Sequence, residues 1–438
     1  MNILGIDIGT TSICMVLYDP KKHKIVEMQS VQNAFLSAGN FLQDADEIVK
    51  KVEEMLKKWE SFSFDAVGIS SQMHGIVYVS DSGRAVSPLY TWKNPWGNCT
   101  FKNGESFARY LTGRTGYPLY TGYGTVTHFY LQTTGDISGD AVGFVDIGDY
   151  LAMRLTGAKN PVVNPSVGAS FGGFNNSLGN FDMEVIEKAG VNIGFYPRIC
   201  TWTEVVGHYH GKKVFTALGD HQASFLAAVE DRKRSIGVNV GTGAQVSVYA
   251  SDLLDEADFF DRKTGSSIDI RPFPREGYLY TGASLNGGKV YERLALFFQE
   301  VCRQFTGITP DIYEKMEQIA AEQKKTSLIA CPNLYGAREG KKAGENSGFF
   351  GLTEENFHPG DLIRSYVHAM AVELFQLYEI FPEKVKKEKT QIVSSGNGLG
   401  KNALLCEEVE SVFGRPLRFS PFKEEAAAGA AIFAWENL

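Results

Sequence analysis

The N-terminal part of the chain combines short apolar runs with one amphipathic stretch. Apolar residues cluster at 3–8 and 13–18, and residues 24–30 suit a third strand of similar length. Residues 44–59 instead place apolar side chains at helical spacing, and residues 66–70 have the composition of a buried strand. This order predicts a βββαβ unit, which is typical of α/β proteins.

The turn between the first two strands has the composition of a phosphate-binding turn. It runs through Gly9, Thr10 and Thr11, and glycine lets the backbone N–H groups come close to an anion. Asp7 lies just before the turn, where its carboxylate could hold a hydrated Mg²⁺ beside the phosphate. A β-hairpin with Gly-Thr at its tip also forms without a ligand, so the motif alone leaves both interpretations open.

The same pattern occurs a second time in the chain. Residues 236–244 (IGVNVGTGA) repeat the character of residues 4–12 (LGIDIGTTS), and an apolar run follows each copy. Two such units predict two similar domains whose Gly-Thr turns, the second at Gly241 and Thr242, meet one nucleotide. Because Asn239 takes the place of the acidic residue, we expect one Mg²⁺ anchor rather than two.

A second candidate ligand-binding turn lies at the C-terminal end of the last predicted strand of this unit. Gln72, Met73 and His74 come after the strand at 66–70, and α/β sheets bind ligands at such carboxyl ends. His74 on an exposed turn could donate to a substrate hydroxyl. A packed or surface histidine is the simpler interpretation of spacing alone.

Asp220 and one glycine-rich turn each have both a structural and a functional interpretation. Asp220 follows an apolar strand at 214–218 and could simply cap the helix at 222–229, as Asp46 could cap the helix at 44–59. The glycine run Ser395–Gly400 leads into a helix from about Asn402, so its backbone could approach a flat or anionic ligand.

Residues 93–135 are rich in glycine, threonine and tyrosine. Trp96, Tyr117, Tyr120 and Tyr123 lie among glycines, and aromatic rings of this kind can form a wall against the C–H faces of a sugar. Loops packed by their own aromatic side chains are an equally good interpretation.

Composition narrows the function classes. The 438 residues are 43% hydrophobic and 21% charged, with a net charge of −8, so the basic footprint of a nucleic-acid-binding protein is missing. The six cysteines contain no C-x-x-C pair, and His208-Tyr209-His210 has no neighbouring ligand, so we expect a turn there rather than a metal site. With neither a signal peptide nor a membrane span expected, the sequence predicts a cytoplasmic protein of two or three domains.

Taken together, these motifs resemble those of the FGGY carbohydrate kinases, and the resemblance covers essentially the whole chain. Each motif is weak alone, whereas their order and spacing are highly specific. The motifs are Asp7–Ser12, Ser71–Gly75, Gly219–Ala223, Gly241-Thr242, Ser395–Gly398 and Glu424–Ala431. Ala283–Gly288 and Gly398–Asn402 look most like the sedoheptulokinase branch of the family, as do, less decisively, Thr121–Gly124 and Leu218–Ser224.

The resemblance implies an α/β fold of two ribonuclease-H-like domains, of the actin/Hsp70/sugar-kinase type, with a cleft between them. It implies a sugar-binding domain at 1–233 that carries the catalytic base, Asp220, and a nucleotide-binding domain at 234–438. Asp7 would hold Mg²⁺ through water. ATP would contact Gly9, Thr10, Thr11, Gly241, Thr242, Gly288, Gly398 and Asn402. The sugar would contact Gln72, Met73, His74, Trp92 and Asp220.

The predicted activity is transfer of the ATP γ-phosphoryl group to a terminal hydroxyl of a ketose, with sedoheptulose as the first candidate. Relatives carry an Asp-x-Arg pair after the pocket tryptophan, whereas this chain has Asn94-Pro95-Trp96, which leaves the sugar open. Another sugar such as xylulose, an actin-like ATPase and a sugar sensor are the alternatives. The partners expected are a sugar and ATP, and a homodimer is one oligomeric state left open.

Overall fold

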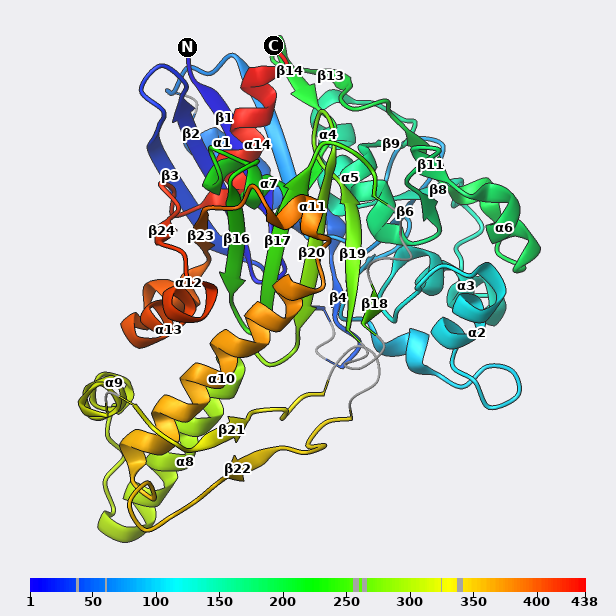
Figure 1. The fold of residues 1–438 in the computed structure, drawn as a ribbon. Coiled ribbons are helices and arrows are strands. Elements are labelled where there is room, and N and C mark those ends of the chain that lie inside the picture. The colour runs from blue at the N-terminus through cyan, green and yellow to red at the C-terminus, as the bar shows by residue number, and fades with distance from the viewer. Residues whose placement is uncertain (37–38, 60, 255–259, 262–265, 324, 337–341) are drawn as a thin grey trace. The chain divides into compact units, whose positions relative to one another are not determined.

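The chain forms two compact units in the computed structural model (Figure 1). The first unit contains Met1–Ala227, Arg271–Gly277 and Glu424–Leu438, and the second contains Ala228–Ile270 and Tyr278–Lys423. The C-terminal segment therefore returns to the first unit. The structure describes residues 1–36, 39–59, 61–254, 260–261, 266–323, 325–336 and 342–438.

The first unit is built on a mixed sheet with the strand order β13-β14-β5-β1-β2-β3, to which β15 adds by pairing with β5. β1 (Ile3–Ile8) is antiparallel to β2 (Ser12–Asp19), which is antiparallel to β3 (Lys24–Gln32). β5 (Ala66–Ser71) runs parallel to β1 and follows helix α1 (Ala45–Lys58), so the predicted βββαβ unit is confirmed.

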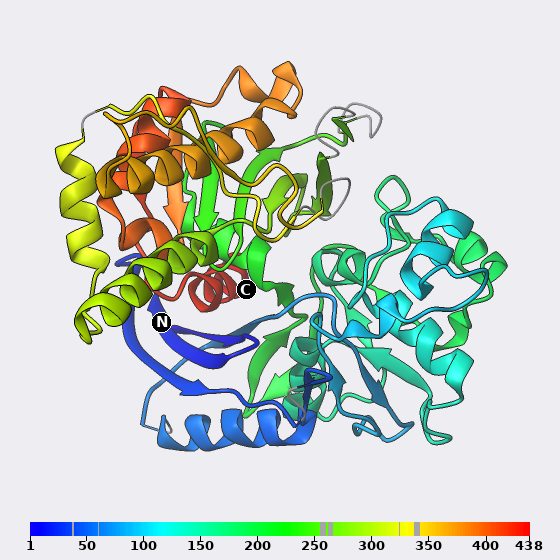
Figure 2. The same ribbon diagram turned by 90° about the horizontal axis from the view of Figure 1, so that it is seen from below.

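Helices α1 and α14 (Glu425–Glu436) lie on opposite faces of β1 and its neighbours (Figure 2). The even-numbered side chains of β1 join the buried cluster that contains α1. Gly5 faces α14 instead, and a Cβ there would lie only 2.0 Å from the carbonyl oxygen of Ala427. Because side chains alternate along a strand, Asp7 lies on the α14 face as well.

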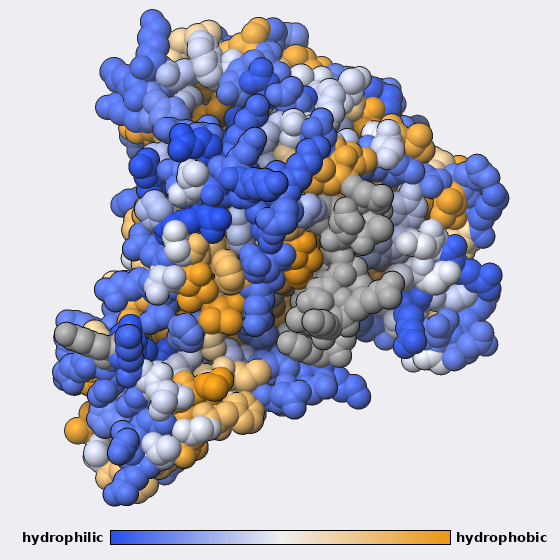
Figure 3. Space-filling model, in the orientation of Figure 1, coloured by the Kyte–Doolittle hydropathy of each residue, from blue (hydrophilic) through white to orange (hydrophobic). Residues whose placement is uncertain are grey.

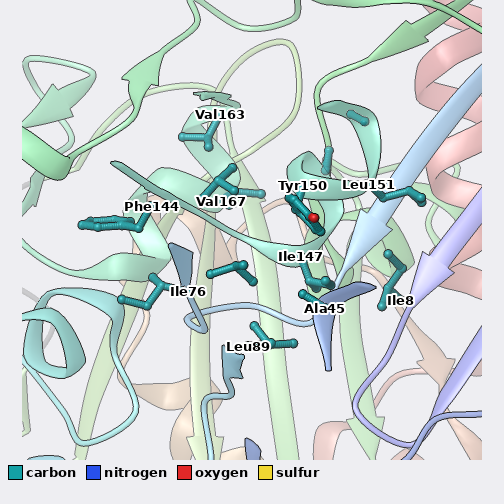
Figure 4. Close-up of a cluster of buried hydrophobic side chains, with 14 of the residues drawn as sticks. Ile8, Ala45, Ile76, Leu89, Phe144, Ile147, Tyr150, Leu151, Val163 and Val167 are labelled. Atoms are coloured by element: carbon teal, nitrogen blue, oxygen red, sulfur yellow. The ribbon is translucent and has the colours of Figure 1, made fainter. Parts of the chain in front are cut away.

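The start of α1 differs from the expected cap. Asp44, not Asp46, is the N-cap, and its carboxylate accepts a hydrogen bond of 3.0 Å from the backbone of Glu47. Asp46 instead accepts one of 2.6 Å from the Tyr150 hydroxyl and pairs with Arg154. Tyr150 and Arg154 belong to α4 (Ile147–Thr156), so Asp46 joins two helices, and their residues Ala45, Ile147 and Tyr150 are part of the buried cluster in Figure 4.

The aromatic segment at 93–135 is largely helical, which its glycine content did not indicate. It forms η1 (Pro95–Asn98), α2 (Phe107–Thr115) and α3 (Gly124–Thr134). Its rings mostly pack on one another: Trp96 stacks on Tyr130 with 5.0 Å between ring centroids. The aromatic side chains of this segment therefore mainly pack against one another and do not form a sugar-binding wall. Tyr123 is the exception, because its ring stacks on His74 of the predicted sugar site.

The second unit repeats the topology of the first. Its sheet has the order β18-β19-β20-β17-β16-β23-β24, in which β16 (Ser235–Val240) takes the place of β1. β16 pairs antiparallel with β17 (Ala244–Ala250) and parallel with β23 (Gln391–Ser395), as β1 does with β2 and β5. The repeat inferred from the sequence is thus confirmed at the level of strand order and direction.

The longer helices of the second unit pack around its core. α10 (Pro359–Glu379) packs against α9 (Tyr313–Glu322) and α13 (Ala403–Phe413), and α8 (Gly288–Thr306) contributes Val290 and Leu294 to the same cluster. In Figure 3, hydrophobic residues appear among hydrophilic ones on the part of this unit around β21 (Ile329–Cys331) and β22 (Gly348–Phe350). Ile329 and Phe350 are cross-strand partners there, and both are exposed.

The remaining elements are short or connect those above. In the first unit they are β4 (Leu42–Gln43), β6 (Val77–Val79), β7 (Leu89–Tyr90), β8 (Gly143–Val145), β9 (Val162–Val163), α5 (Pro165–Gly168), η2 (Ala169–Phe171), β10 (Phe174–Asn175), β11 (Asn180–Phe181), α6 (Met183–Lys188), η3 (Ile193–Phe195), β12 (Arg198–Ile199), β13 (Val205–Tyr209), β14 (Lys212–Phe215) and β15 (Leu218–Gly219). The others are α7 (Asp220–Ala228), β18 (Phe260–Asp261), β19 (Ser266–Pro272), β20 (Tyr278–Ser284), α11 (Glu383–Lys386), α12 (Asn397–Gly400) and β24 (Leu417–Phe419).

Candidate active site

The first Gly-Thr turn is held so that its carbonyl groups face protein. Asn33 donates to the carbonyl oxygens of Gly9 and Thr11 through its side chain and backbone, at 3.1 and 2.9 Å. Gln43 donates through Nε2 to the carbonyl oxygen of Thr10 at 2.8 Å. Within the described residues, the backbone N–H groups of Thr10 and Thr11 have no acceptor. A turn with engaged carbonyls and available N–H groups suits an anion.

The second Gly-Thr turn is held in a comparable way by the start of α8. The backbone N–H groups of Gly288 and Lys289 donate to the carbonyl oxygens of Gly241 and Thr242, at 2.8 and 3.2 Å. Gly287 lies so close that a Cβ there would be 2.1 Å from the carbonyl carbon of Gly243. Side chains larger than glycine would separate the turn from the helix, which explains the Gly287-Gly288 pair.

The other nucleotide candidates divide into one neighbour of this turn and one helix cap. A Cβ on Gly398 would lie 2.2 Å from the carbonyl oxygen of Val240, so Gly398 packs directly before the turn at Gly241. Asn402 is the N-cap of α13, and its side chain accepts a hydrogen bond of 2.9 Å from Leu405. A capping role therefore accounts for Asn402 by itself.

Asp7 is a carboxylate in an unfavourable environment. Burial raises its pKa to about 8, and the negative charges of Asp220 and Glu424 add to this effect. A hydrogen bond of 2.8 Å from the Ser70 hydroxyl acts in the opposite direction, because it stabilises the ionised carboxylate. The negative charges of Asp7, Asp220 and Glu424 act on one another, and a bound cation would reduce this repulsion.

Asp220 is the first residue of α7, directly after β15. Burial raises its pKa to about 6, while a hydrogen bond of 2.8 Å from the His221 N–H and the positive charge of Arg271 lower it. Arg271 also donates to Nδ1 of His221 at 3.0 Å, and together with burial it holds the pKa of His221 well below its usual range. Asp220 thus stays mostly ionised at neutral pH without a neighbouring imidazolium.

The turn after β5 meets the strand that leads to Asp220. Ser71 and Gly219 are register partners in the parallel pair of β5 and β15. A Cβ on Gly219 would lie 2.9 Å from the sulfur of Met73, so Met73 packs directly against the residue before Asp220. The structure therefore brings the predicted sugar-binding turn and the predicted base to one edge of the sheet.

His74 has a strained backbone and a fixed ring. Its φ is 74°, in the left-handed region that residues with side chains seldom adopt. The Ser170 hydroxyl accepts a hydrogen bond of 3.0 Å from the His74 N–H, and the Ser170 carbonyl oxygen lies 2.7 Å from Nδ1. A carbonyl oxygen only accepts, so Nδ1 carries the proton and the neutral ring presents Nε2 as an acceptor. The expectation that His74 donates to a hydroxyl is thus wrong for the neutral ring, which stacks on Tyr123 at 4.4 Å.

Trp92 contacts the first Gly-Thr turn, which was predicted to bind phosphate, rather than a separate aromatic wall. Its indole Nε1 donates to the Thr10 hydroxyl at 2.9 Å, and 43% of the residue is exposed. Asn94 is fully buried, caps η1 and donates to the carbonyl oxygen of Asn40. Asn94 and Trp96, which stand where relatives carry the Asp-x-Arg pair, therefore have packing roles in this chain.

Neighbours of the site that the sequence did not indicate include Asn33, Gln43, Ser70, Ser170 and Arg271, and Glu424 was noted only as part of a motif and not as a neighbour of Asp7. Ser70 could have been found, because it follows Ile69 on the strand expected beside β1. Arg271 and Glu424 come from distant segments that join the first unit only in the folded chain. No local pattern around either residue indicates that contact.

A cavity of about 500 Å³ lies in the second unit between α10, β20 and β21. Ser284 and Asn286 contribute to its lining and hydrogen-bond to Oε1 of Glu373, at 2.6 and 3.4 Å. The candidate nucleotide residues Gly288, Gly398 and Asn402 are not part of its lining.

Two expectations concern metals and membranes. Among the described residues, no group of three or more His, Cys, Asp or Glu side chains could hold a metal ion. His208 belongs to β13, and only His210 lies in the predicted turn. None of the described helices is long and apolar enough to cross a membrane.

Comparison with known families covers the chain almost end to end. Residues 2–235 match the N-terminal domain of the FGGY family of carbohydrate kinases, and residues 237–436 match its C-terminal domain. The chain belongs to the FGGY family of carbohydrate kinases. It is therefore an ATP-dependent sugar kinase, and the resemblance found in the motifs is confirmed.

Individual FGGY relatives differ in the sugar that they act on. Sedoheptulokinases of Mus musculus and Homo sapiens are each 26% identical to this chain, and the match covers 98% of the chain and 96% of each relative. A gluconokinase of Bacillus licheniformis is 20% identical over 98% of this chain and 86% of its own.

Solved structures confirm the two-domain FGGY fold. Ligand-bound xylulose kinase from Lactobacillus acidophilus matches with a TM-score of 0.79 at 21% identity, covering 99% of this chain and 89% of that one. Plasmodium falciparum glycerol kinase with ADP matches with a TM-score of 0.78 at 17% identity, covering 99% and 88%.

Proposed function

We propose that this FGGY kinase transfers the γ-phosphoryl group of ATP to the terminal hydroxyl of sedoheptulose, giving the 7-phosphate, with Asp220 as the general base. The observation that carries the base assignment is the position of Asp220 at the start of α7, against the Gln72–His74 turn. The sedoheptulose assignment is supported by the two sedoheptulokinases that align along nearly the full chain.

Phosphoryl transfer does not require a strong base. Phosphoryl transfer passes through a loose transition state, in which the attacking hydroxyl gives up its proton late. A carboxylate whose pKa is about 6 is ionised at neutral pH and can accept that proton. Such general-base help is worth roughly 10²–10⁴-fold, and positioning and charge stabilisation supply the rest.

Asp7 is proposed to hold Mg²⁺, and the two Gly-Thr turns to hold phosphate oxygens. The carboxylate of Asp7 fits a magnesium ion because Mg²⁺ keeps several waters and needs only one or two protein carboxylates beside substrate phosphates. Bound Mg²⁺ supplies positive charge beside the phosphates. The N–H groups of Thr10 and Thr11 would then contribute directed donors next to it.

The structure and the relatives support the alternative functions to different degrees. A sugar sensor without kinase activity rested on Asn94 and Trp96. Asn94 is fully buried and Trp96 is partly buried and stacked on Tyr130, so both have packing roles and that support is removed. Xylulose remains the second candidate substrate, because xylulose kinases share the fold at a TM-score of 0.79. We also infer a cytoplasmic location from the unpaired cysteine pattern.

The test measures ATP consumption with a panel of sedoheptulose, xylulose, gluconate, other ketoses and polyols, each against a no-sugar control. Sedoheptulose should give the highest kcat/KM. Asp220→Asn should retain ATP binding and lose at least 10²-fold in kcat, whereas the exposed control Asp140→Asn should match the unchanged protein. A higher kcat/KM for another sugar would show that this sugar, and not sedoheptulose, is the preferred substrate. Near-normal turnover of Asp220→Asn would show that Asp220 is not the general base.

A further inference from the structure

We propose that Gln43, Gln72 and Trp92 withhold the Thr10 hydroxyl from phosphate until a sugar binds, so that Gln43 is a positioning residue for the transfer. This inference rests on the proposed function, because it assigns sugar to Trp92 and Gln72 and phosphate to Thr10. All four residues lie in the first unit.

The hydroxyl of Thr10 is engaged on both sides. The Trp92 indole N–H donates to Thr10 Oγ1 at 2.9 Å, and an indole nitrogen can only donate. Thr10 Oγ1 in turn donates to Oε1 of Gln72 at 3.2 Å. Since a hydroxyl has one proton, a phosphate oxygen, which only accepts, cannot receive it in this arrangement.

The orientation of Gln72 is set by Gln43. Gln43 Nε2 donates to the carbonyl oxygen of Thr10 at 2.8 Å, which leaves Gln43 Oε1 to accept from Gln72 Nε2 at 2.8 Å. Gln72 therefore turns its own Oε1 toward the Thr10 hydroxyl. Gln43 is fully buried and Gln72 is 2% exposed, so reversing either amide would leave like groups facing each other without water.

Trp92 is the most exposed of these four hydrogen-bonded residues, with 43% of its surface accessible. A polyol presents neighbouring hydroxyls, each of which both donates and accepts, so one can accept from the indole and another can donate to Gln72. The Thr10 proton is then available to a phosphate oxygen. A hydrogen bond to a charged group changes affinity by roughly 10–100-fold, and linkage requires ATP to tighten sugar binding by the same factor.

The experiment measures binding of a non-hydrolysable ATP analogue by calorimetry, with and without saturating sugar, for the unchanged protein and three variants. Gln43→Leu frees the Gln72 amide, Trp92→Phe removes the indole donor, and Thr10→Val removes the hydroxyl. The unchanged protein should show coupling of about tenfold or more. Gln43→Leu and Thr10→Val should bring the coupling factor close to one, Trp92→Phe should lower it because the sugar loses one of its two contacts, and Thr10→Ser, which keeps the hydroxyl, should keep it.

Gln132→Leu is the matched control. Gln132 also bridges two backbone groups of the first unit, the carbonyl of Gly190 and the N–H of Asn192, at 3.0 and 2.8 Å. It should keep the coupling of the unchanged protein. ATP hydrolysis without sugar should rise in Gln43→Leu, which a purely structural role for Gln43 would not produce.

The outcomes separate the two proposals. If a sugar is phosphorylated and the Gln43 and Trp92 variants keep full coupling, this inference is wrong and the kinase assignment stands. If no sugar in the panel is phosphorylated or changes analogue binding, the proposed function fails and this inference fails with it. Parallel loss of thermal stability and of every kinetic constant, with unchanged coupling, would reduce Gln43 to a packing role.

Discussion

Ser70 donates a hydrogen bond of 2.8 Å to Oδ1 of Asp7 across the parallel pair of β5 and β1. The same register in the second unit makes Ser395 the partner of Asn239 across β23 and β16. The two halves of the chain thus keep the serine and change its partner from an acid to an amide. The acidic copy also lies near two further carboxylates, Asp220 and Glu424.

We expect Asp7→Asn to stabilise the protein in the absence of Mg²⁺ and nucleotide. The pKa of Asp7 is about 8 in the folded chain and about 4 when the chain is unfolded. Between these values the folded state binds more protons than the unfolded state, so the stability of the unchanged protein falls as pH rises. The variant, which has no ionisable group there, avoids this loss.

Urea unfolding between pH 4 and pH 8 tests this expectation. The advantage of Asp7→Asn over the unchanged protein should be absent near pH 4 and grow toward pH 8, while Asp140→Asn shows no such trend. A constant difference across the range would contradict the raised pKa of Asp7.

We expect the acid limb of kcat/KM to follow the ionisation of Asp220. Burial places its pKa at about 6, so activity should fall as pH drops through about 6, where the base becomes protonated. Arg271 lowers this pKa, so Arg271→Met should move the limb to higher pH, and Arg271→Lys should move it less. An identical pH profile in all three proteins would show that Arg271 does not influence the pKa of the catalytic base.

Local pattern was enough to predict the elements that carry the first turn. Asp7, the Gly-Thr turn and the βββαβ order follow from apolar runs of strand length and one helical stripe, and each is a property of neighbouring residues. The second copy at Asn239 could be found for the same reason. The repeat made two related sheets the natural prediction, which the strand orders confirm.

Long-range contacts could not be predicted in the same way. Glu424 lies near Asp7 only because the C-terminal segment belongs to the first unit, and Arg271 reaches His221 from the separate segment 271–277 of the same unit. Helices α2 and α3 were missed because their stabilisation comes from rings stacked across elements, as in Trp96 on Tyr130, and not from a local stripe. The N-cap moved from Asp46 to Asp44 because Tyr150 and Arg154 take up the later carboxylate.

We expect the contact between α14 and β5 to tolerate no side chain at Gly68. A Cβ there would lie 1.9 Å from the carbonyl oxygen of Ala430, and backbone cannot move as a flexible side chain can. Gly68→Ala should cost about 3 kcal/mol, at the upper end for overpacking. Gly113→Ala in α2 is the control, because nothing lies within 4 Å of its Cβ position, and it should stabilise the helix by roughly 0.5–1 kcal/mol. Similar unfolding midpoints for the two variants in urea would contradict the close packing of α14.

We expect Ser170→Ala to raise the KM for sugar more than it lowers kcat. The serine hydroxyl accepts the His74 N–H at 3.0 Å and so helps to hold His74 at its left-handed φ of 74°. Without that bond the backbone can relax, which would turn Nε2 and the stacked Tyr123 ring away from a sugar hydroxyl. His74→Gly keeps the backbone geometry without strain but loses the ring, so it should raise KM further. Kinetics at varied sugar and saturating ATP measure both effects, and an unchanged KM in both variants would exclude His74 from the sugar site.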